Sequence, residues 1–270
     1  MITSLSNVQI RHVSMLQKKS RYRLQEGQFV AEGVKMVMET PEGLLDRIYI
    51  SEDFQADPEV KAWLKGKDRE VVSSKVFKAL SMTQTPQGIL AVVKMHQPSP
   101  ETLLSSGSSF LILETLQDPG NLGTILRTAE GAGMDGIFMN KTCVDIYNPK
   151  VVRSTMGSLY RMPFVYVDDL HGLMSKMKSR GIRLYAAHLK GKNNYYDEDL
   201  SRPCAFLIGN EANGLSDETA AMADVYVKIP MSGQVESLNA AMAAGILMYE
   251  MRRQKVTIQS GKSNDSAIVL

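Results

Sequence analysis

Polar side chains gather at three places where an apolar run ends, and the first is residues 117–130, QDPGNLGTILRTAE. A Pro-Gly-Asn turn opens this stretch, and a helical pattern follows it. Asn121 can cap the helix, and Arg127 falls on its second turn, where a guanidinium could reach a ligand bound near the helix. A surface pair between Arg127 and Glu130, at i and i+3, is an alternative that needs no ligand.

The second stretch is residues 208–218, IGNEANGLSDE, which follows a strand-like apolar run. Its glycines and asparagines leave backbone donors and acceptors free and give a flat ligand room to approach the main chain. The Ser-Asp-Glu at 216–218 is typical of a helix N-terminus, so ordinary capping explains that part. Capping leaves Asn210 and Glu211 unexplained, and these two residues are therefore candidates for a functional role.

The third stretch is residues 227–239, VKIPMSGQVESLN. A proline directly after the strand ends strand pairing, and Gly233 allows an unusual turn. Ser237 and Asn239 then place two polar side chains at the start of a helix whose next residues, 240–245, are mostly alanine and glycine. A capped helix with a closely packed small-residue face accounts for these features without any chemistry.

Other common chemistries find no support in the sequence. Cys143 and Cys204 stand alone, without a CxxC pair or clustered histidines, and are expected to be reduced core thiols. The four histidines have no ligand spacing, and neither HExxH nor GxSxG occurs. We therefore expect no metal site and no hydrolase of those types.

Residues 131–136, GAGMDG, spell the GxGxxG pattern of dinucleotide-binding enzymes. That motif requires a strand before the glycines and a helix after them, so that the pyrophosphate meets a helix N-terminus. Here the helical pattern precedes the glycines and an apolar strand follows. The glycines are thus expected to end a helix, and an oxidoreductase that binds a nicotinamide cofactor is a disfavoured alternative.

The whole chain of 270 residues, 44% apolar, predicts an α/β protein with a small unit followed by a larger one. Pro and Ser clusters indicate the boundaries of a first domain at 1–97, a linker at 98–108, a second domain at 109–255 and a disordered tail at 256–270. In the first domain, one helix is expected at 7–20, and a second helix is expected to follow Gly27 to Gly33 and to end near residue 40. Further helices are expected at 58–64 and 75–80. Strands are expected at 47–51 and 88–94. In the second domain, near-continuous apolar strands that alternate with helices predict a largely parallel sheet. These strands are expected at 110–116, 136–139, 164–167, 183–187, 204–209 and 225–229, and a last helix at 237–253.

Charge is spread unevenly, although the net charge is only +2. Residues 1–25 contain five basic residues and no acidic one. A solvated helix face and a phosphate-binding surface both explain this pattern. No apolar run reaches the length of a membrane span, and no signal-peptide pattern opens the chain, so a cytoplasmic protein without membrane association is expected.

Taken together, the three stretches resemble the TrmH, or SpoU, family of RNA ribose 2'-O-methyltransferases in the SPOUT superfamily. The motifs NLGTILRTAE, LIGNEANGLS and IPMSGQVESLN follow one another in the family's order. The segment GQFVAEG at 27–33 is similar to the substrate-binding domain that ribosomal-RNA members carry. With this resemblance, the basic residues near the N-terminus are expected to contact RNA, namely Arg11, Lys18, Lys19, Arg21 and Arg23.

The resemblance implies a SPOUT catalytic domain with a C-terminal trefoil knot, preceded by a small α/β RNA-binding domain. It implies S-adenosyl-L-methionine as the cofactor and a homodimer as the active form. The cofactor-binding residues that it implies are Gly209, Ile229, Leu238, Leu207, Met231 and Gly233. The catalytic residues that it implies are Arg127, Asn121, Glu211, Ser237 and Asn239.

An arginine is a poor general base because its pKa lies above about 12. We therefore expect Arg127 to hold a phosphate and orient the ribose, while the phosphate or a water assists proton loss. A role as the base itself stays open and would require a strongly lowered pKa. Ribosomal RNA, most simply 23S, is the expected substrate; a transfer-RNA enzyme and a non-catalytic RNA-binding protein of the same fold are the alternatives. The sequence does not indicate which nucleotide is modified or any link to antibiotic resistance.

Overall fold

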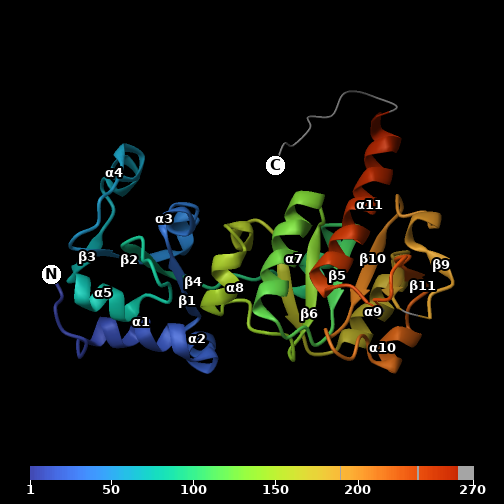
Figure 1. Cartoon of the computed structure of the whole chain (residues 1–270), viewed down its shortest axis with the longest axis horizontal. Coiled ribbons are helices and arrows are strands. Elements are labelled where there is room, and N and C mark those ends of the chain that lie inside the picture. Colours follow the sequence, from blue (N-terminus) through green and yellow to red (C-terminus); the bar gives the residue numbers. More distant parts are fainter. Residues whose placement is uncertain (189, 236, 261–270) are drawn as a thin grey trace. The chain divides into compact units, whose positions relative to one another are not determined.

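The computed structural model describes residues 1–188, 190–235 and 237–260 (Figure 1). The chain divides into two compact units. The first unit combines residues 1–96 with residues 145–161, and the second combines residues 97–144 with the chain from residue 162 onward. The first unit is thus built from two separate segments of the sequence.

The first unit contains a mixed sheet in the order β1-β4-β2-β3, in which β4 pairs antiparallel with β1 and β2, and β2 pairs parallel with β3. Its strands are β1 Gln28–Glu32, β2 Leu45–Ser51, β3 Arg69–Val72 and β4 Ile89–Lys94. Its helices are α1 Val8–Lys18, α2 Ser20–Glu26, α3 Val34–Met38, α4 Pro58–Leu64, α5 Ser74–Leu80 and α8 Pro149–Ser154, with 3-10 turns at Glu42–Leu44 and Ser158–Tyr160. Apolar residues of α1 and α5 pack with those of the sheet into a core.

Strand β1 was not predicted from the sequence. Its apolar stretch is short, and glycines flank it on both sides. Gly27 ends α2 with φ 62° and Gly33 opens α3 with φ 99°, conformations that glycine adopts without strain. The two glycines therefore separate a five-residue strand from a helix on each side, where the sequence alone predicted only a connection.

The second unit contains a sheet of parallel strands in the order β7-β6-β5-β10-β8-β11-β9. Its strands are β5 Ser109–Leu113, β6 Gly136–Asn140, β7 Phe164–Val167, β8 Arg183–Ala187, β9 Asn193–Asn194, β10 Cys204–Ile208 and β11 Val225–Lys228. Its helices are α6 Pro100–Ser105, α7 Pro119–Ala132, α9 Leu170–Ser179, α10 Asp217–Ala221 and α11 Ala240–Ser260, with a 3-10 turn at Tyr195–Asp197. The predicted α/β class and parallel sheet are confirmed. Because parallel strands point the same way, their carboxyl ends, and the three polar stretches after them, lie at one edge.

The glycines at 131–136 behave as the sequence predicted. Helix α7 ends at Gly133, which has φ 71° and donates its backbone N–H to Glu130, and β6 begins three residues later at Gly136. A Cβ atom on Gly136 would lie 2.6 Å from the Leu103 side chain, so this glycine allows close packing. The GxGxxG pattern therefore has a structural explanation.

Helix α6 occupies part of the stretch at 98–108 for which a linker was predicted. Ser99 caps it by accepting a hydrogen bond from the Thr102 backbone N–H at 3.1 Å. Leu103 and Leu104 are buried in the core of the second unit. A single apolar pair among serines and prolines gave too weak a periodicity to predict this helix.

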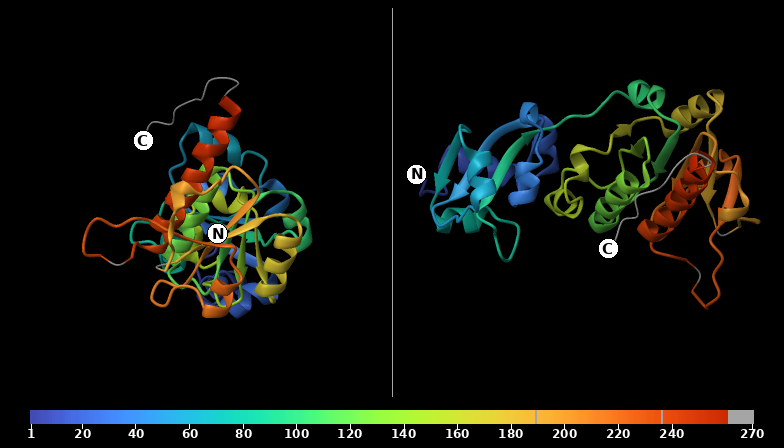
Figure 2. Two further views of the ribbon diagram at one scale, coloured as in Figure 1. Left: turned by 90° about the vertical axis from the view of Figure 1, so that its right-hand side faces the viewer. Right: turned by 90° about the horizontal axis from the view of Figure 1, so that it is seen from above.

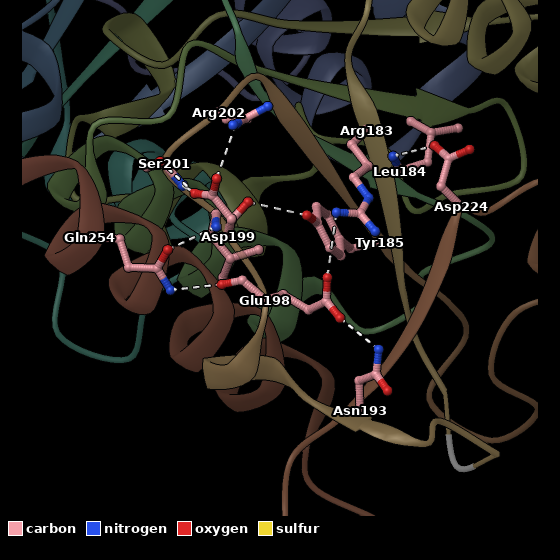
Figure 3. Close-up of polar contacts among 11 residues, drawn as sticks. Arg183, Leu184, Tyr185, Asn193, Glu198, Asp199, Ser201, Arg202, Asp224 and Gln254 are labelled. Atoms are coloured by element: carbon pink, nitrogen blue, oxygen red, sulfur yellow. Dashed lines mark hydrogen bonds and ion pairs between the residues drawn. The ribbon is translucent and has the colours of Figure 1, made fainter.

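Helix α11 runs alongside α7 (Figure 2) and continues past the end that was predicted for it. Gln254 accepts a hydrogen bond from the Leu200 backbone N–H at 2.8 Å and donates one to the Glu198 carbonyl at 3.0 Å (Figure 3). These contacts hold the helix at Gln254, and α11 continues to Ser260, into the stretch for which a disordered tail was predicted. The rest of the predicted tail, 261–270, lies outside the described residues.

Candidate functional site

The N-terminus of α7 places Asn121 at the site but not as the helix cap that was predicted. Pro119 occupies the first helical position, where its missing N–H costs nothing, so the preceding residue becomes the cap. The Asp118 side chain accepts the Asn121 backbone N–H at 2.8 Å. The Asn121 side chain, which is 9% exposed, is therefore available for contacts with other loops.

Glu211, in the loop after β10, connects that loop to the start of α7. Its carboxylate accepts hydrogen bonds from the backbone N–H groups of Gln117 at 3.1 Å and Asp118 at 2.9 Å. It also accepts one from Asn121 Nδ2 at 3.0 Å. Partial burial raises the pKa of Glu211, but these hydrogen bonds outweigh burial and hold the pKa below its ordinary value. Glu211 is thus expected to be ionised at neutral pH.

Asn239 adds the third loop to this arrangement. Its Oδ1 accepts the backbone N–H groups of Ala241 at 2.9 Å and Met242 at 3.3 Å at the start of α11. Its Nδ2 donates to Asn121 Oδ1 at 2.8 Å. Each asparagine accepts with its side-chain oxygen and donates with its side-chain nitrogen. The hydrogen bonds therefore run in one direction, from Asn239 to Asn121 and from Asn121 to the Glu211 carboxylate.

Sequence reasoning missed two functional candidates, Glu114 in the turn after β5 and Asn140 at the end of β6. Glu114 accepts hydrogen bonds from the Ser216 backbone N–H and the Ser216 Oγ, both at 2.8 Å, and from Thr219 Oγ1. Thr115 has φ 56°, an uncommon conformation for a residue with a branched Cβ. Asn140, at the end of β6, accepts the Thr115 backbone N–H at 2.9 Å, and Asn210 Nδ2 donates to the Thr115 carbonyl at 2.9 Å. A polar residue at the end of a buried strand was the available signal for Glu114 and Asn140.

Gly209 permits the tight turn that carries Glu211. A Cβ atom at this position would lie 2.1 Å from the Gly214 carbonyl carbon, so no other residue fits without movement of the backbone. Asn210 and Gly214 close the turn through two backbone hydrogen bonds of 2.9 Å. Leu207, two residues earlier, is fully buried in the core, and β10 pairs with a strand on each side of it.

Comparison with known proteins identifies the family. Residues 108–249 match the SpoU rRNA Methylase family, and residues 7–91 match the MRM3-like substrate binding domain. The chain belongs to the SpoU rRNA methylase family. The family that the motifs predicted is therefore confirmed.

Relatives of the SpoU family resemble this chain over nearly its full length. The 23S rRNA (guanosine(2553)-2'-O)-methyltransferase RlmP of Bacillus subtilis is 31% identical over 253 residues, which cover 93% of this chain and 98% of RlmP. The SpoU methyltransferase AviRb from Streptomyces viridochromogenes, solved with AdoMet, has a TM-score of 0.84 at 27% identity and covers 93% and 99% of the two chains. An AdoMet-bound rRNA methyltransferase from Sinorhizobium meliloti has a TM-score of 0.81 at 30% identity and covers 93% and 97%. The shared fold thus includes both units.

Arg127, the residue first assigned to catalysis from the SpoU motifs, lies exposed on α7. Six residues separate it from Asn121, which corresponds to about 9 Å of rise and about 240° of rotation, so the two side chains leave different faces. Within the described part of the chain, Arg127 forms neither a hydrogen bond nor an ion pair, and the alternative surface pair with Glu130 is not formed. Its guanidinium is free to meet an external ligand.

The loop between β11 and α11 contains the remaining SpoU-motif residues. Ile229, Met231 and Leu238 are half-buried, whereas Gly233 and Ser237 are exposed. Toward the described residues, Ser237 makes no hydrogen bond, and the backbone of 229–235 donates none. The structure therefore joins Asn239 to Asn121 and, through Asn121, to Glu211. The backbone N–H groups of Ile229 and of residues 231–235 donate to no described residue.

The basic residues near the N-terminus divide into two groups. Arg11, Lys18, Lys19 and Arg21 are exposed. Arg23 is only 3% exposed; its Nε lies 2.9 Å from Asp145 Oδ2, and its Nη1 donates to the Leu16 carbonyl at 2.7 Å. The prediction that Arg23 contacts RNA is wrong, because its guanidinium is used to hold residues 145–161 against α2.

No sign of another chemistry appears among the described residues. They contain no group of three or more His, Cys, Asp or Glu side chains placed to hold a metal ion. Both cysteines are free and buried, as predicted, and burial raises the pKa of Cys143 to about 11 and of Cys204 to about 12, so both remain neutral thiols. No helix in the described residues is long and apolar enough to span a bilayer.

Proposed function

We propose that this chain transfers a methyl group from S-adenosylmethionine to a ribose 2'-hydroxyl of RNA, with 23S ribosomal RNA as the substrate. The observation that carries the proposal is the chain of hydrogen bonds Asn239–Asn121–Glu211, which joins three loops at one edge of the parallel sheet. These are the three loops that contain the motifs of the SpoU family. The named activity of RlmP supports ribosomal RNA over transfer RNA.

The loop at 229–239 and the turn at Gly209 fit the methyl donor. Recognition of an adenine by main-chain groups requires backbone N–H and C=O groups without partners. Ile229 and residues 231–235 supply backbone N–H groups that donate to no described residue. Ile229, Met231 and Leu238 add half-buried apolar surface for the flat ring. The residues proposed to bind S-adenosylmethionine also include Gly209, Gly233 and Leu207, which lies near the end of β10. S-adenosylmethionine, when bound there, supplies a methyl group on a positively charged sulfur.

The role of the chain is then mainly to position the ribose. Attack by the hydroxyl oxygen is in line, and positioning of this kind accounts for roughly 7 to 11 kcal/mol in intramolecular reactions. Arg127 holds the phosphate of the target nucleotide with its free guanidinium and so orients the ribose. The hydroxyl proton passes to that phosphate or to a water, because arginine is too weak a base.

The polar chain keeps this site in shape rather than transferring protons. Ionised Glu211 holds the turn before α7, and Asn121 transmits that position to Asn239 and α11. Ser237, which is exposed, is proposed to contact the ribose or Arg127. Glu211, Asn121 and Asn239 are therefore expected to affect the position of the substrate.

The first unit is proposed to bind the RNA around the target nucleotide. It matches a substrate-binding domain, and Arg11, Lys18, Lys19 and Arg21 present exposed positive charge for phosphates. With ribosomal RNA as the substrate, the reaction takes place in the cytoplasm. A homodimer is proposed as the active form, since apolar side chains remain exposed on α11.

The test measures transfer of labelled methyl from S-adenosylmethionine to ribosomal RNA and, separately, to transfer RNA. Wild type should label ribosomal RNA as an alkali-resistant dinucleotide, and Arg127→Ala should lose the label while still binding the methyl donor in calorimetry. Arg252→Ala, which removes another exposed arginine, is the matched control and should label normally. Label only in transfer RNA would replace the proposed substrate, and no label in either RNA would favour a non-catalytic RNA-binding protein.

Arg127→Lys separates the two roles of the arginine. Lysine retains the charge but not the planar pair of donors, so orientation by two hydrogen bonds should be lost and turnover should fall about tenfold or more. Near-normal turnover of this variant would contradict the orienting role.

A further inference from the structure

The first unit contains a groove that has no role in the site described above. It encloses about 660 Å³ between α1, α2 and the sheet. The residues that line it are Val8, Gln9, Arg11, His12, Met15, Tyr22, Gln28, Asp46, Arg47, Tyr49 and Val92. This volume lies within the range of pockets that hold small ligands, about 300 to 1,000 Å³.

Two arginines give the groove positive charge. Arg11 Nε donates to the Ser6 carbonyl at 3.0 Å, and no described residue accepts a hydrogen bond from its two terminal nitrogens. Arg47 lies 3.9 Å from Glu70, but both side chains are well exposed and the pair is weak. Asp46 is the acidic residue of the lining. The groove can therefore attract an anionic group such as a phosphate.

His12 and Tyr22 form a fixed aromatic surface in this groove. Their ring centroids are 5.6 Å apart with the rings inclined at 68°. His12 Nδ1 lies 2.9 Å from the Tyr22 hydroxyl, and His12 Nε2 lies 2.9 Å from Gln28 Oε1. The Gln28 oxygen can only accept, so Nε2 carries a proton in this arrangement. Hydrogen bonds on both nitrogens hold the imidazole ring, and the Tyr22 ring lies edge to face against it.

Gln9 adds a polar group that lacks a partner. Its Oε1 is buried, yet it accepts no hydrogen bond from the described residues. A buried acceptor of this kind costs free energy unless a donor reaches it. If the Gln9 side chain rotates toward the groove, a ligand that brings an N–H group there would supply that donor.

We propose that this groove binds one nucleotide of single-stranded RNA, in a part of the RNA substrate other than the methylated nucleotide. The base lies against Tyr22 and His12 and donates an N–H from its edge to Gln9, while Arg11 and Arg47 bind the adjacent phosphate. Stacking on an aromatic ring, edge hydrogen bonds and a nearby guanidinium are the contacts by which proteins hold unpaired nucleotides. The inference rests on the proposed function, because it assigns part of the same RNA substrate to a second site.

Binding of the full-length protein to a 23S ribosomal RNA transcript tests the groove. Tyr22→Ala removes the stacking surface and is expected to raise the Kd at least about fivefold, the lower end of the effect of one stacked base. Tyr22→Phe keeps the ring and should bind nearly as well as wild type. Trp63→Ala, an aromatic residue of the same unit outside the lining, is the control and should leave the Kd unchanged.

The phosphate contact is tested with Arg47→Ala. This variant should weaken RNA binding and reduce the dependence of the Kd on salt concentration by about one ion. Lys61→Ala, an exposed cation on α4, is the matched control. Thermal melting of each variant separates loss of contact from loss of fold.

Methylation kinetics distinguish failure of this inference from failure of the proposed function. Groove variants should raise the KM for RNA while kcat and the Kd for S-adenosylmethionine stay unchanged. If wild type methylates RNA but Tyr22→Ala and Arg47→Ala match their controls, the groove does not bind RNA and the proposed function stands. If wild type neither binds nor methylates RNA, both proposals fail.

Discussion

Glu211 accepts three hydrogen bonds from the start of α7 and the turn before it, and it can do so only while both carboxylate oxygens act as acceptors. The same carboxylate ends the polar chain that begins at Asn239. No side chain in this chain of contacts needs to transfer a proton. At the scale of single residues, these hydrogen bonds therefore fix the positions of three loops, while Arg127 lies exposed on α7 without a partner among the described residues.

Glu211→Gln tests this role. One of the two side-chain oxygens becomes an NH₂ group, which faces a backbone N–H, so at least one hydrogen bond to a charged acceptor is lost. We expect methyl transfer to fall about tenfold or more while the protein stays folded. Glu218→Gln, an exposed carboxylate in α10, should leave the rate unchanged. Equal rates for the two variants would contradict the role of Glu211.

The lowered pKa of Glu211 predicts a pH dependence with a definite sign. Its pKa in the folded state lies below the unfolded value of about 4.3, so its stabilising effect is fully present above that value. The effect is lost as the pH falls through the folded-state pKa. The acid limb of thermal stability should therefore be steeper in wild type than in Glu211→Gln, and parallel acid limbs would show that Glu211 does not contribute.

Asn140 is expected to stabilise the unusual backbone of Thr115. Its side chain accepts the Thr115 N–H, and its Nδ2 lies 3.2 Å from Thr115 Oγ1. Asn140→Ala should lower both activity and Tm, because the positive φ then lacks this support. Thr115→Gly removes the cost of that φ and should restore much of the activity of Asn140→Ala. Failure of the glycine to rescue would indicate that Asn140 acts in another way.

At the scale of elements, the sequence predicted six of the seven described strands of the second unit because each of the six is a short, mostly apolar run. The same reasoning missed β1, whose apolar run is only three residues long, and β9, which is two asparagines. It missed α6 because serines and prolines surround its buried leucines. Periodicity detects a buried face only when enough residues repeat it.

The candidate site was predictable only through motif resemblance. Spacing placed Asn121, Glu211 and Asn239 in three separate loops, and the sheet order that brings these loops together cannot be read from spacing. The cap at Asp118 follows from Pro119, a local rule that identifies the correct residue. No local rule could predict that Arg23 is buried in an ion pair, because its partner Asp145 is 122 residues away in the sequence.

Helix α11 is held at both ends, by Asn239 near its start and by Gln254 near its end (Figure 3). Gln254→Ala removes two half-buried hydrogen bonds to residues 198–200, which corresponds to about 1 to 2 kcal/mol. We expect the Tm to fall by roughly 2 to 8 °C. Arg252→Ala, on an exposed position of the same helix, should change the Tm little. An unchanged Tm for Gln254→Ala would mean that packing against α7 alone holds the helix.

At the scale of the whole molecule, the division into units does not follow the order of the chain. Residues 145–161 leave the sequence of the second unit and pack within the first. Their attachment depends on the buried pair between Arg23 and Asp145 and on Tyr160, whose hydroxyl accepts a hydrogen bond from Thr40 Oγ1 at 2.9 Å. Both units thus belong to one folded protein, and cutting the chain near residue 97 would separate α8 from the strand β1 that it packs against.

Helix α11 provides the surface by which we expect two copies to associate. Ala244, Leu247 and Met248 are buried, whereas Met242 and Tyr249 are 61% and 49% exposed. These two residues stand seven apart, so they lie on one face of the helix, with Ile246 between them. An exposed apolar stripe on a helix is a common contact surface between identical subunits.

Light scattering of wild type should therefore give twice the mass of one chain. Met242→Asp places a charge at one end of the stripe and should shift the mass toward that of a single chain, with a matching loss of methyl transfer if both copies complete the site. Leu24→Asp, on an exposed apolar residue of α2, is the control and should remain dimeric. A single-chain mass for wild type over the whole concentration range would show that α11 does not form a dimer interface, and Met242→Asp should then methylate RNA at the wild-type rate.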